Sequence, residues 1–165
     1  MKITRVGVDI AKNVFQVHGA DRYGRLVWRR QLRRANWLKV VTEQLEAGCE
    51  IGMEACSGAH HWARQLRSRG FEVKLIPAQY VKPYVKSQKN DVTDAEAICE
   101  AMSRPGMRFV AIKTVEQQDI QAIHRVRASV VGQRTAQANQ IRGLASEYGL
   151  VAPQHLGSLR KAMPD

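Results

Sequence analysis

The sequence lacks the features that mark secreted and membrane proteins. No apolar run approaches the roughly 18 residues that would cross a membrane, and the N-terminus, with Lys2 and Arg5, has no apolar signal-peptide core. The cysteines are scattered and form no Cys-x-x-Cys pair, so neither a zinc finger nor a disulfide framework is indicated. Reduced thiols are the simplest explanation. We therefore expect a cytoplasmic protein with no membrane partner.

Acidic residues are also scarce. The chain has 15 Asp and Glu residues against 26 Lys and Arg residues, which gives a net charge of +11. An excess of this kind favours an anionic partner, most often nucleic acid, over a merely soluble basic protein. Hydrophobic residues make up 44% of the sequence, which is enough for the core of one domain with an appendage.

The rest of the chain is organised around its N-terminal stretch, ITRVGVDIAKNVFQV. Val6 and Val8 alternate with other residues at the period of a half-buried strand, and Asp9 stands where that strand ends. A short turn that contains Lys12 leads into a second, returning strand. A carboxylate on a central strand is costly to bury without a partner. Asp9 therefore either faces solvent at the strand's edge or has a positive partner.

A third strand is predicted over residues 25–32, after a second turn. Three strands joined by short turns make an antiparallel meander. Basic residues crowd the third strand and its exit, where they form a candidate phosphate-binding edge or protect an edge strand from aggregation, and the two interpretations are compatible. These basic residues are Arg22, Arg25, Arg29, Arg30, Arg33, Arg34 and Lys39.

Two helix–strand units complete the predicted sheet. Asn36 is expected to cap the first helix, and the strand 50–54 follows and ends in Glu54. Ser57 is expected to cap the second helix, before a fifth strand over 72–76. The result is an α/β fold, a mixed five-stranded sheet with flanking helices, and this layout resembles the ribonuclease H superfamily.

A lysine-rich loop with a broken helical turn, interrupted by Pro83, is predicted after the fifth strand. Its lysines are interleaved with Tyr80 and Tyr84, a mixture that suits single strands or backbone phosphates and suits an ordinary mobile loop equally well. A capping box from Thr93 to Glu96 then predicts the start of another helix. The lysines of the loop are Lys82, Lys86 and Lys89.

The stretch 115–148 contains no proline. As a single helix of about 34 residues it would span about 50 Å, more than a small domain needs. Its apolar residues fall at spacings of three, four and seven, which predicts a projecting helix that forms a coiled coil or contacts nucleic acid. The alternative is two shorter helices broken near Gly132. The arginines that line it are Arg125, Arg127, Arg134 and Arg142.

Four carboxylates fall at the ends of predicted elements. Asp9 ends the first strand and Glu54 ends the fourth, and Asp91 and Asp94 open the helix after the fifth. The first and fourth strands are neighbours in this topology, and ligands gather at the carboxyl ends of such strands. Singly, each acid is explained as a turn residue, a strand-end charge or a favourable helix N-terminal charge. Together they favour a Mg²⁺ or Mn²⁺ site for phosphoryl transfer.

Three segments carry a family resemblance, in matching order and spacing: VGVDIAKNVFQVH, GMEACSGAHHWARQL and NDVTDAEAI. They resemble the DEDD transposases and Piv-type DNA invertases, whose N-terminal domain is RuvC-like. The resemblance implies that Asp9, Glu54, Asp91 and Asp94 are the catalytic, metal-binding tetrad. It also implies an insertion-sequence DNA recombinase, whose relatives are guided by a structured bridge RNA.

We therefore expect a RuvC-like domain over 1–112, a long helix over 113–150 that mediates a homodimer or higher oligomer, and, over 151–165, a tail or the start of a C-terminal domain. Members of the family continue into a second domain with a nucleophilic serine, so these residues are expected to be inactive alone. Ser57 is better explained as a helix cap than as that nucleophile. The alternatives are a stand-alone structure-selective nuclease, such as a junction resolvase, or a non-catalytic module that binds DNA or RNA and dimerises.

Overall fold

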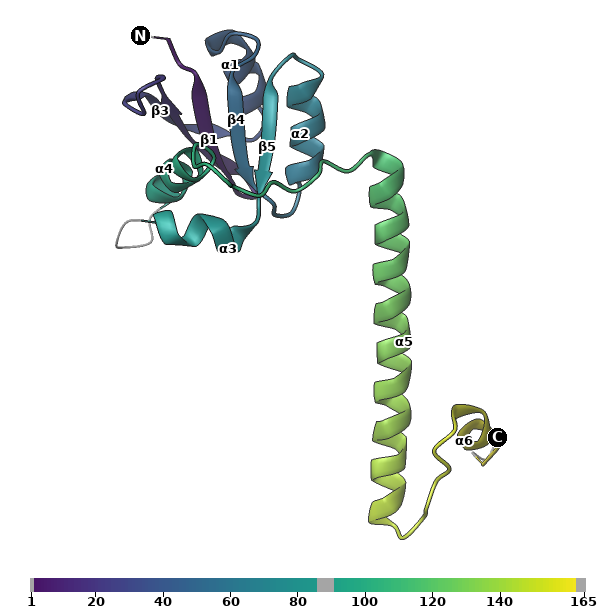
Figure 1. Ribbon diagram of the computed structural model, residues 1–165. Coiled ribbons are helices and arrows are strands. Elements are labelled where there is room, and N and C mark those ends of the chain that lie inside the picture. Colours follow the sequence, from purple (N-terminus) through teal and green to yellow (C-terminus); the bar gives the residue numbers. More distant parts are fainter. Residues whose placement is uncertain (1, 86–90, 163–165) are drawn as a thin grey trace. The chain divides into compact units, whose positions relative to one another are not determined.

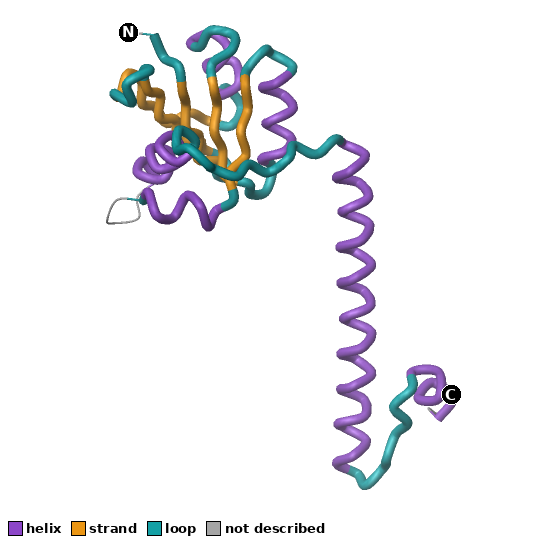
Figure 2. Tube along the Cα trace, viewed as in Figure 1, coloured by secondary structure: helices purple, strands orange, loops and turns teal. Residues whose placement is uncertain are grey.

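The computed structural model describes residues 2–85 and 91–162, with the side chains of 91 and 92 excepted. The chain divides into two units after Thr114. The first unit is built on a five-stranded sheet, orange in Figure 2, and all the predicted strands form. They are β1 (Arg5–Ile10), β2 (Val14–Ala20), β3 (Leu26–Arg33), β4 (Glu50–Glu54) and β5 (Glu72–Ile76).

The strand order is β3-β2-β1-β4-β5. Short turns join the first three strands, which therefore pair antiparallel. Helices connect β3 to β4 and β4 to β5, and the β1–β4 and β4–β5 pairs are parallel. This mixed sheet with β1 at its centre confirms the predicted ribonuclease H-like fold, and it places the basic strand β3 at an edge.

One face of the sheet is covered by α1 (Trp37–Gln44) and α2 (Ala59–Arg67), as Figure 1 shows. The centre of this core is a cluster of three aromatic side chains packed edge to face. The ring centroids of Phe15 and Trp37 are 4.8 Å apart, and those of Trp37 and Trp62 are 5.1 Å apart. Phe15, Trp37 and Trp62 are all buried, so the cluster joins β2 to both helices.

The opposite face is covered by α4 (Asp91–Ala101), beside the short helix α3 (Ala78–Val81) and the 3₁₀ turn Lys82–Tyr84. The buried side of α4 is apolar, and Ile98 and, just beyond the helix, Met102 pack there in a second core cluster. The lysine-rich loop predicted after β5 is thus helical up to residue 84. Lys86 and Lys89 lie outside the described residues.

The second unit contains the long helix α5 (Val115–Glu147), which runs through Gly132 without a break. The single-helix prediction is therefore confirmed. The helix ends before Gly149, whose φ of +74° is the left-handed conformation common after helices. A further helix, α6 (Leu156–Ala162), was not predicted. No helix in the described part of the chain is long and apolar enough to span a membrane.

Of the three predicted helix caps, Asn36 is confirmed in position and the other two are wrong. Gly58, not Ser57, is the residue before α2, and its φ of +83° is a backbone conformation that glycine adopts without the strain other residues incur. Asn36 does precede α1, but its side chain makes no capping hydrogen bond. Helix α4 begins at Asp91, so Thr93 is its third residue and the capping box is not its start.

Candidate metal and nucleic-acid site

The two central parallel strands each carry the pattern glycine-x-acid near their ends: β4 ends in Gly-Met-Glu, and β1 contains Gly-Val-Asp and runs one residue beyond the predicted end, to Ile10. Val8 and Met53 are register partners in the α1–α2 core, so the residues on either side of them face α4. The β1–β4 pairing ends at Val8 and Met53, and continuing the same register by one step would bring Asp9 next to Glu54, on strands about 4.8 Å apart. Both residues are half-buried.

The thiol of Cys56 gives independent support for this proximity. Its pKa is raised by burial first, and then by the negative charges of Glu54 and Asp9. One sulfur atom therefore lies within the field of both carboxylates. The connection after β4 also returns to the sheet edge, because the N–H of Ala55 donates to the carbonyl oxygen of Ile76 at 2.8 Å.

Asp94 comes from α4 and meets Glu54 in one cavity. The cavity encloses about 340 Å³, and its lining residues come from β4, from α4 and from the segment 78–85. Lys82 is the one cationic side chain among the described residues that line it, and the remaining wall is apolar. The lining consists of Glu54, Ala78, Val81, Lys82, Val85 and Asp94.

The donor atoms available here suit a hard divalent cation. Carboxylate oxygens are the ligands that Mg²⁺ and Mn²⁺ prefer, and the cavity has room for bound water. Within residues 2–85 and 91–162, however, no three His, Cys, Asp or Glu side chains form a ready-made metal cluster. Asp91 is the first residue of α4, and its side chain lies outside the described residues. The four-residue metal site therefore remains a prediction.

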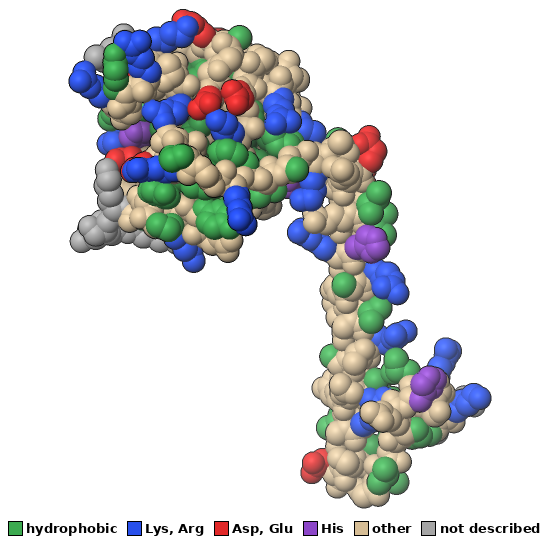
Figure 3. Space-filling view, viewed as in Figure 1, with side chains coloured by type: hydrophobic (Ala, Val, Ile, Leu, Met, Phe, Trp, Pro, Cys, Tyr) green, Lys and Arg blue, Asp and Glu red, His purple; other side chains and the backbone are tan. Residues whose placement is uncertain are grey.

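The predicted basic edge lies on and beside β3, and Figure 3 shows blue Lys and Arg side chains outnumbering red acidic ones on the face in view. The Arg22 and Arg25 guanidinium groups lie 4.6 and 5.6 Å from the ring centroid of Tyr23. Arg29 forms an ion pair with Glu96 at 3.7 Å. The remaining basic residues of this region, which are exposed or half-exposed, are Lys12, Arg30, Arg33, Arg34 and Lys39.

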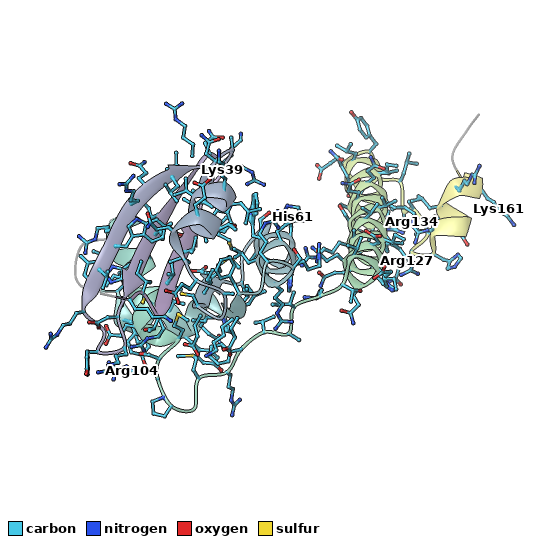
Figure 4. The ribbon with its side chains drawn as sticks, turned by 90° about the horizontal axis from the view of Figure 1, so that it is seen from above. Lys39, His61, Arg104, Arg127, Arg134 and Lys161 are labelled. Carbon is cyan, nitrogen blue, oxygen red and sulfur yellow. The ribbon has the colours of Figure 1, made fainter. Side chains whose placement is uncertain are left out.

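The arginines of α5 are of two kinds. Arg127 and Arg134 are exposed, and Figure 4 shows them on the same side of the helix, as their spacing of seven requires. Arg125 is exposed as well. Arg142 instead binds the chain that follows the helix, because its Nε donates to the carbonyl oxygen of Pro153 at 2.9 Å. Its guanidinium group holds the turn between α5 and α6.

One anchoring contact has no signal in the sequence. The backbone N–H of Lys113 donates to His60 Nδ1 at 3.2 Å, and Arg64 Nη1 donates to the Lys113 carbonyl oxygen at 2.6 Å. Burial lowers the pKa of His60, and the positive charges of Lys113 and Arg64 lower it further. The partners are about fifty residues apart in sequence, so only the fold brings them together.

A sequence profile of one transposase family, the DEDD transposases of the IS110 type, matches residues 6–149. A Pseudomonas aeruginosa protein named "Probable family 20 transposase" is 55% identical over 152 residues, which are 92% of this chain and 44% of that protein. The transposase for insertion sequence element IS1111A of Coxiella burnetii is 53% identical over 145 residues, 88% of this chain and 39% of that protein.

The chain therefore belongs to the DEDD transposase family, and it spans less than half the length of the curated relatives that it matches. The transposase for insertion sequence element IS1328 of Yersinia enterocolitica, 40% identical, fits the same pattern, with 96% of this chain and 47% of that protein aligned. Among solved structures, T. thermophilus RuvC in complex with a Holliday junction substrate aligns with 67% of this chain and all of that chain, at a TM-score of 0.46 and 12% identity.

Proposed function

We propose that this chain is the RuvC-like part of an insertion-sequence DNA transposase, and that Asp9, Glu54, Asp91 and Asp94 hold Mg²⁺ or Mn²⁺ for DNA strand cleavage and exchange. The observation that carries the proposal is that Glu54 and Asp94 line one cavity, with Asp9 near the end of the neighbouring strand β1. A divalent ion bound there would neutralise charge on a phosphodiester and activate the attacking group.

Lys82 has a separate role in the proposal. Lys82 lines the same cavity as Glu54 and Asp94, so its ammonium group is available to hold a backbone phosphate near them. The apolar wall of Val81 and Val85 leaves room for the sugar and base that accompany that phosphate. The more distant arginines of β3 and α5 then bind the flanking DNA and, as the family resemblance implies, a structured guide RNA.

A manganese titration tests the metal site. Wild-type protein and the near-isosteric variants Asp9→Asn and Glu54→Gln are titrated with Mn²⁺ by calorimetry. Each variant should bind about tenfold more weakly or worse, because each loses a negative oxygen ligand. Glu72→Gln is the matched control, since Glu72 begins β5 at the opposite end of the sheet. Unchanged binding by both site variants would refute the metal site.

A cleavage assay separates the proposal from its alternatives. By themselves, residues 1–165 should bind DNA without exchanging strands, because the resemblance implies a nucleophilic serine in a second domain. Metal-dependent cutting of branched DNA by these residues would instead identify a junction nuclease. Binding without cutting that is indifferent to both metal and Glu54→Gln would identify a non-catalytic module.

A further inference from the structure

Two glycines without side chains let α4 rest directly on the centre of the sheet. Gly7 of β1 and Gly52 of β4 are register partners, both are buried, and both face α4. A Cβ atom on Gly7 would lie 2.1 Å from the carbonyl oxygen of Ala95 and 2.6 Å from the backbone nitrogen of Cys99. One on Gly52 would lie 2.8 Å from Met102 Sδ. Real Cβ atoms do not approach other atoms this closely, so the contact requires glycine.

The same contact sets the distance between α4 and the sheet near Asp9 and Glu54. Gly7 precedes Asp9 by two residues on one face of β1, about 6.6 Å along the strand. The N-terminal half of α4 lies at this end of the sheet, because Asp94 shares a cavity with Glu54. The C-terminal half lies at the other end, because Cys99 and Glu100 line a cavity with Arg5. The helix thus runs antiparallel to β1, with Gly7 beneath its middle.

We propose that Gly7 and Gly52 are positioning residues of the metal site, which act by seating α4 so that its acids reach those of β1 and β4; this inference rests on the function proposed above. The two contacts differ in kind. At Gly7 the opposing atoms are backbone, so any side chain lifts the helix. At Gly52 the nearest atom is the flexible end of Met102, which can move aside or be removed.

The test introduces alanine at each glycine and measures two quantities. Gly7→Ala should weaken Mn²⁺ binding about tenfold or more while the protein stays folded by circular dichroism. Gly52→Ala should weaken binding less, and Gly52→Ala combined with Met102→Ala should restore it. Gly19→Ala is the control, because Gly19 is a buried sheet glycine of β2 whose nearest neighbours are side chains of Ile3 and Trp28, at 3.2 Å.

The rate at which Cys99 is alkylated reports on the packing of α4 against the sheet and requires no metal. Cys99 is 5% exposed and its Cβ lies 2.9 Å from the position a Gly7 Cβ would take, so lifting the helix should speed its reaction with iodoacetamide, followed by mass spectrometry. Cys49, also 5% exposed and in the other core, should stay protected. If folded Gly7→Ala protein shows wild-type Cys99 protection, or an affinity loss no larger than that of Gly19→Ala, the inference is wrong.

A failure of the proposed function looks different. Suppose that wild-type protein binds no Mn²⁺ but that Gly7→Ala still makes Cys99 more reactive. The metal site would then be refuted, while the role of Gly7 in packing α4 against the sheet would stand. If Gly7→Ala does not fold, the single variant Gly52→Ala and the double variant with Met102→Ala decide. Mn²⁺ binding that is weakened in the single variant and restored in the double variant supports the inference. Wild-type Mn²⁺ affinity in folded Gly52→Ala protein overturns it.

Discussion

Asp21 shows how a single carboxylate fixes the turn between β2 and β3. The residue is 6% exposed, and its Oδ1 accepts hydrogen bonds from the backbone N–H groups of Tyr23 at 2.8 Å and Arg25 at 2.9 Å. The bond from Arg25 lowers the pKa of Asp21 most, and the bond from Tyr23 and the nearby arginine charges also lower it, against the opposing effect of burial. The ionised form is therefore the one that the folded protein stabilises.

We expect Asp21→Ala to lower the midpoint of thermal unfolding, because two turn N–H groups lose their acceptor. The wild-type advantage should be full above the ordinary aspartate pKa of about 4, and should shrink as the pH falls further through the lowered folded pKa. Thermal melts of both proteins at pH 7 and pH 3 measure this. An advantage that does not change between the two pH values would show that ionised Asp21 is not its source.

The residues of the candidate site were only partly predictable. Alternating apolar residues predicted β1, and Asp9 and Glu54 were singled out because each was expected to end its strand. Strand β4 does end at Glu54, whereas β1 continues to Ile10. The role of Gly7 was missed, since it depends on where α4 crosses the sheet some ninety residues later. The repeated glycine-x-acid pattern was the available signal. The prediction that Ser57 caps α2 was wrong. It relied on the capping ability of a serine side chain, whereas the chain enters the helix through the left-handed backbone conformation of Gly58.

At the scale of elements, α5 contains two glycines at positions where a larger side chain would fit. A Cβ on Gly132 or on Gly143 would meet no atom within 4 Å outside the local helix backbone. We expect Gly132→Ala and Gly143→Ala to stabilise the helix by about 1 kcal/mol each, because alanine loses less backbone entropy than glycine on becoming helical. Thermal melts followed by far-ultraviolet circular dichroism measure the gain.

Gly149 is the matched control for this prediction. It lies just beyond α5 with a φ of +74°, a conformation in which alanine is strained. Gly149→Ala should therefore destabilise the same unit by roughly 1–2 kcal/mol. Identical effects at all three positions would mean that backbone conformation does not govern them.

The long helix was the element easiest to predict, and its surroundings were the hardest. The absence of proline over more than thirty residues predicted a continuous helix, and α5 is continuous. Helix α6 was missed because LGSLRKA is short and contains a glycine, so its own sequence favours a helix only weakly. Its position depends on contacts such as the buried side chain of Leu159 and the Arg142 bond to Pro153.

At the scale of the whole molecule, self-association through α5 stays a prediction. Ile123 is 68% exposed and Leu144 is 59% exposed, at positions three heptads apart. Fully burying such a side chain is worth about 1.5–3 kcal/mol, and the polar residues between them weaken the seam, so we expect a modest dimer. Sedimentation at high salt, with nucleic acid removed, measures it, since salt weakens arginine–phosphate bridges but not an apolar seam.

Ile123→Asp combined with Leu144→Asp should give a monomer in that experiment. Thr135→Asp, an exposed change on the opposite side of the heptad pattern, should leave the dimer intact. A wild-type monomer at tens of micromolar would count against the helix as a dimer element. A dimer that survives the double substitution would place the contact elsewhere.

The aromatic cluster of the first unit has a practical consequence. The three tryptophans of the chain are Trp28, Trp37 and Trp62, so every indole precedes the division after Thr114. Tryptophan fluorescence therefore reports only on the sheet unit, where Trp37 and Trp62 pack edge to face with Phe15. Ellipticity instead reports on the helices of both units, of which α5 is the longest. One unlabelled sample thus carries two spectroscopic signals, and the temperatures at which they change will reveal whether the two units melt as one cooperative body or as two.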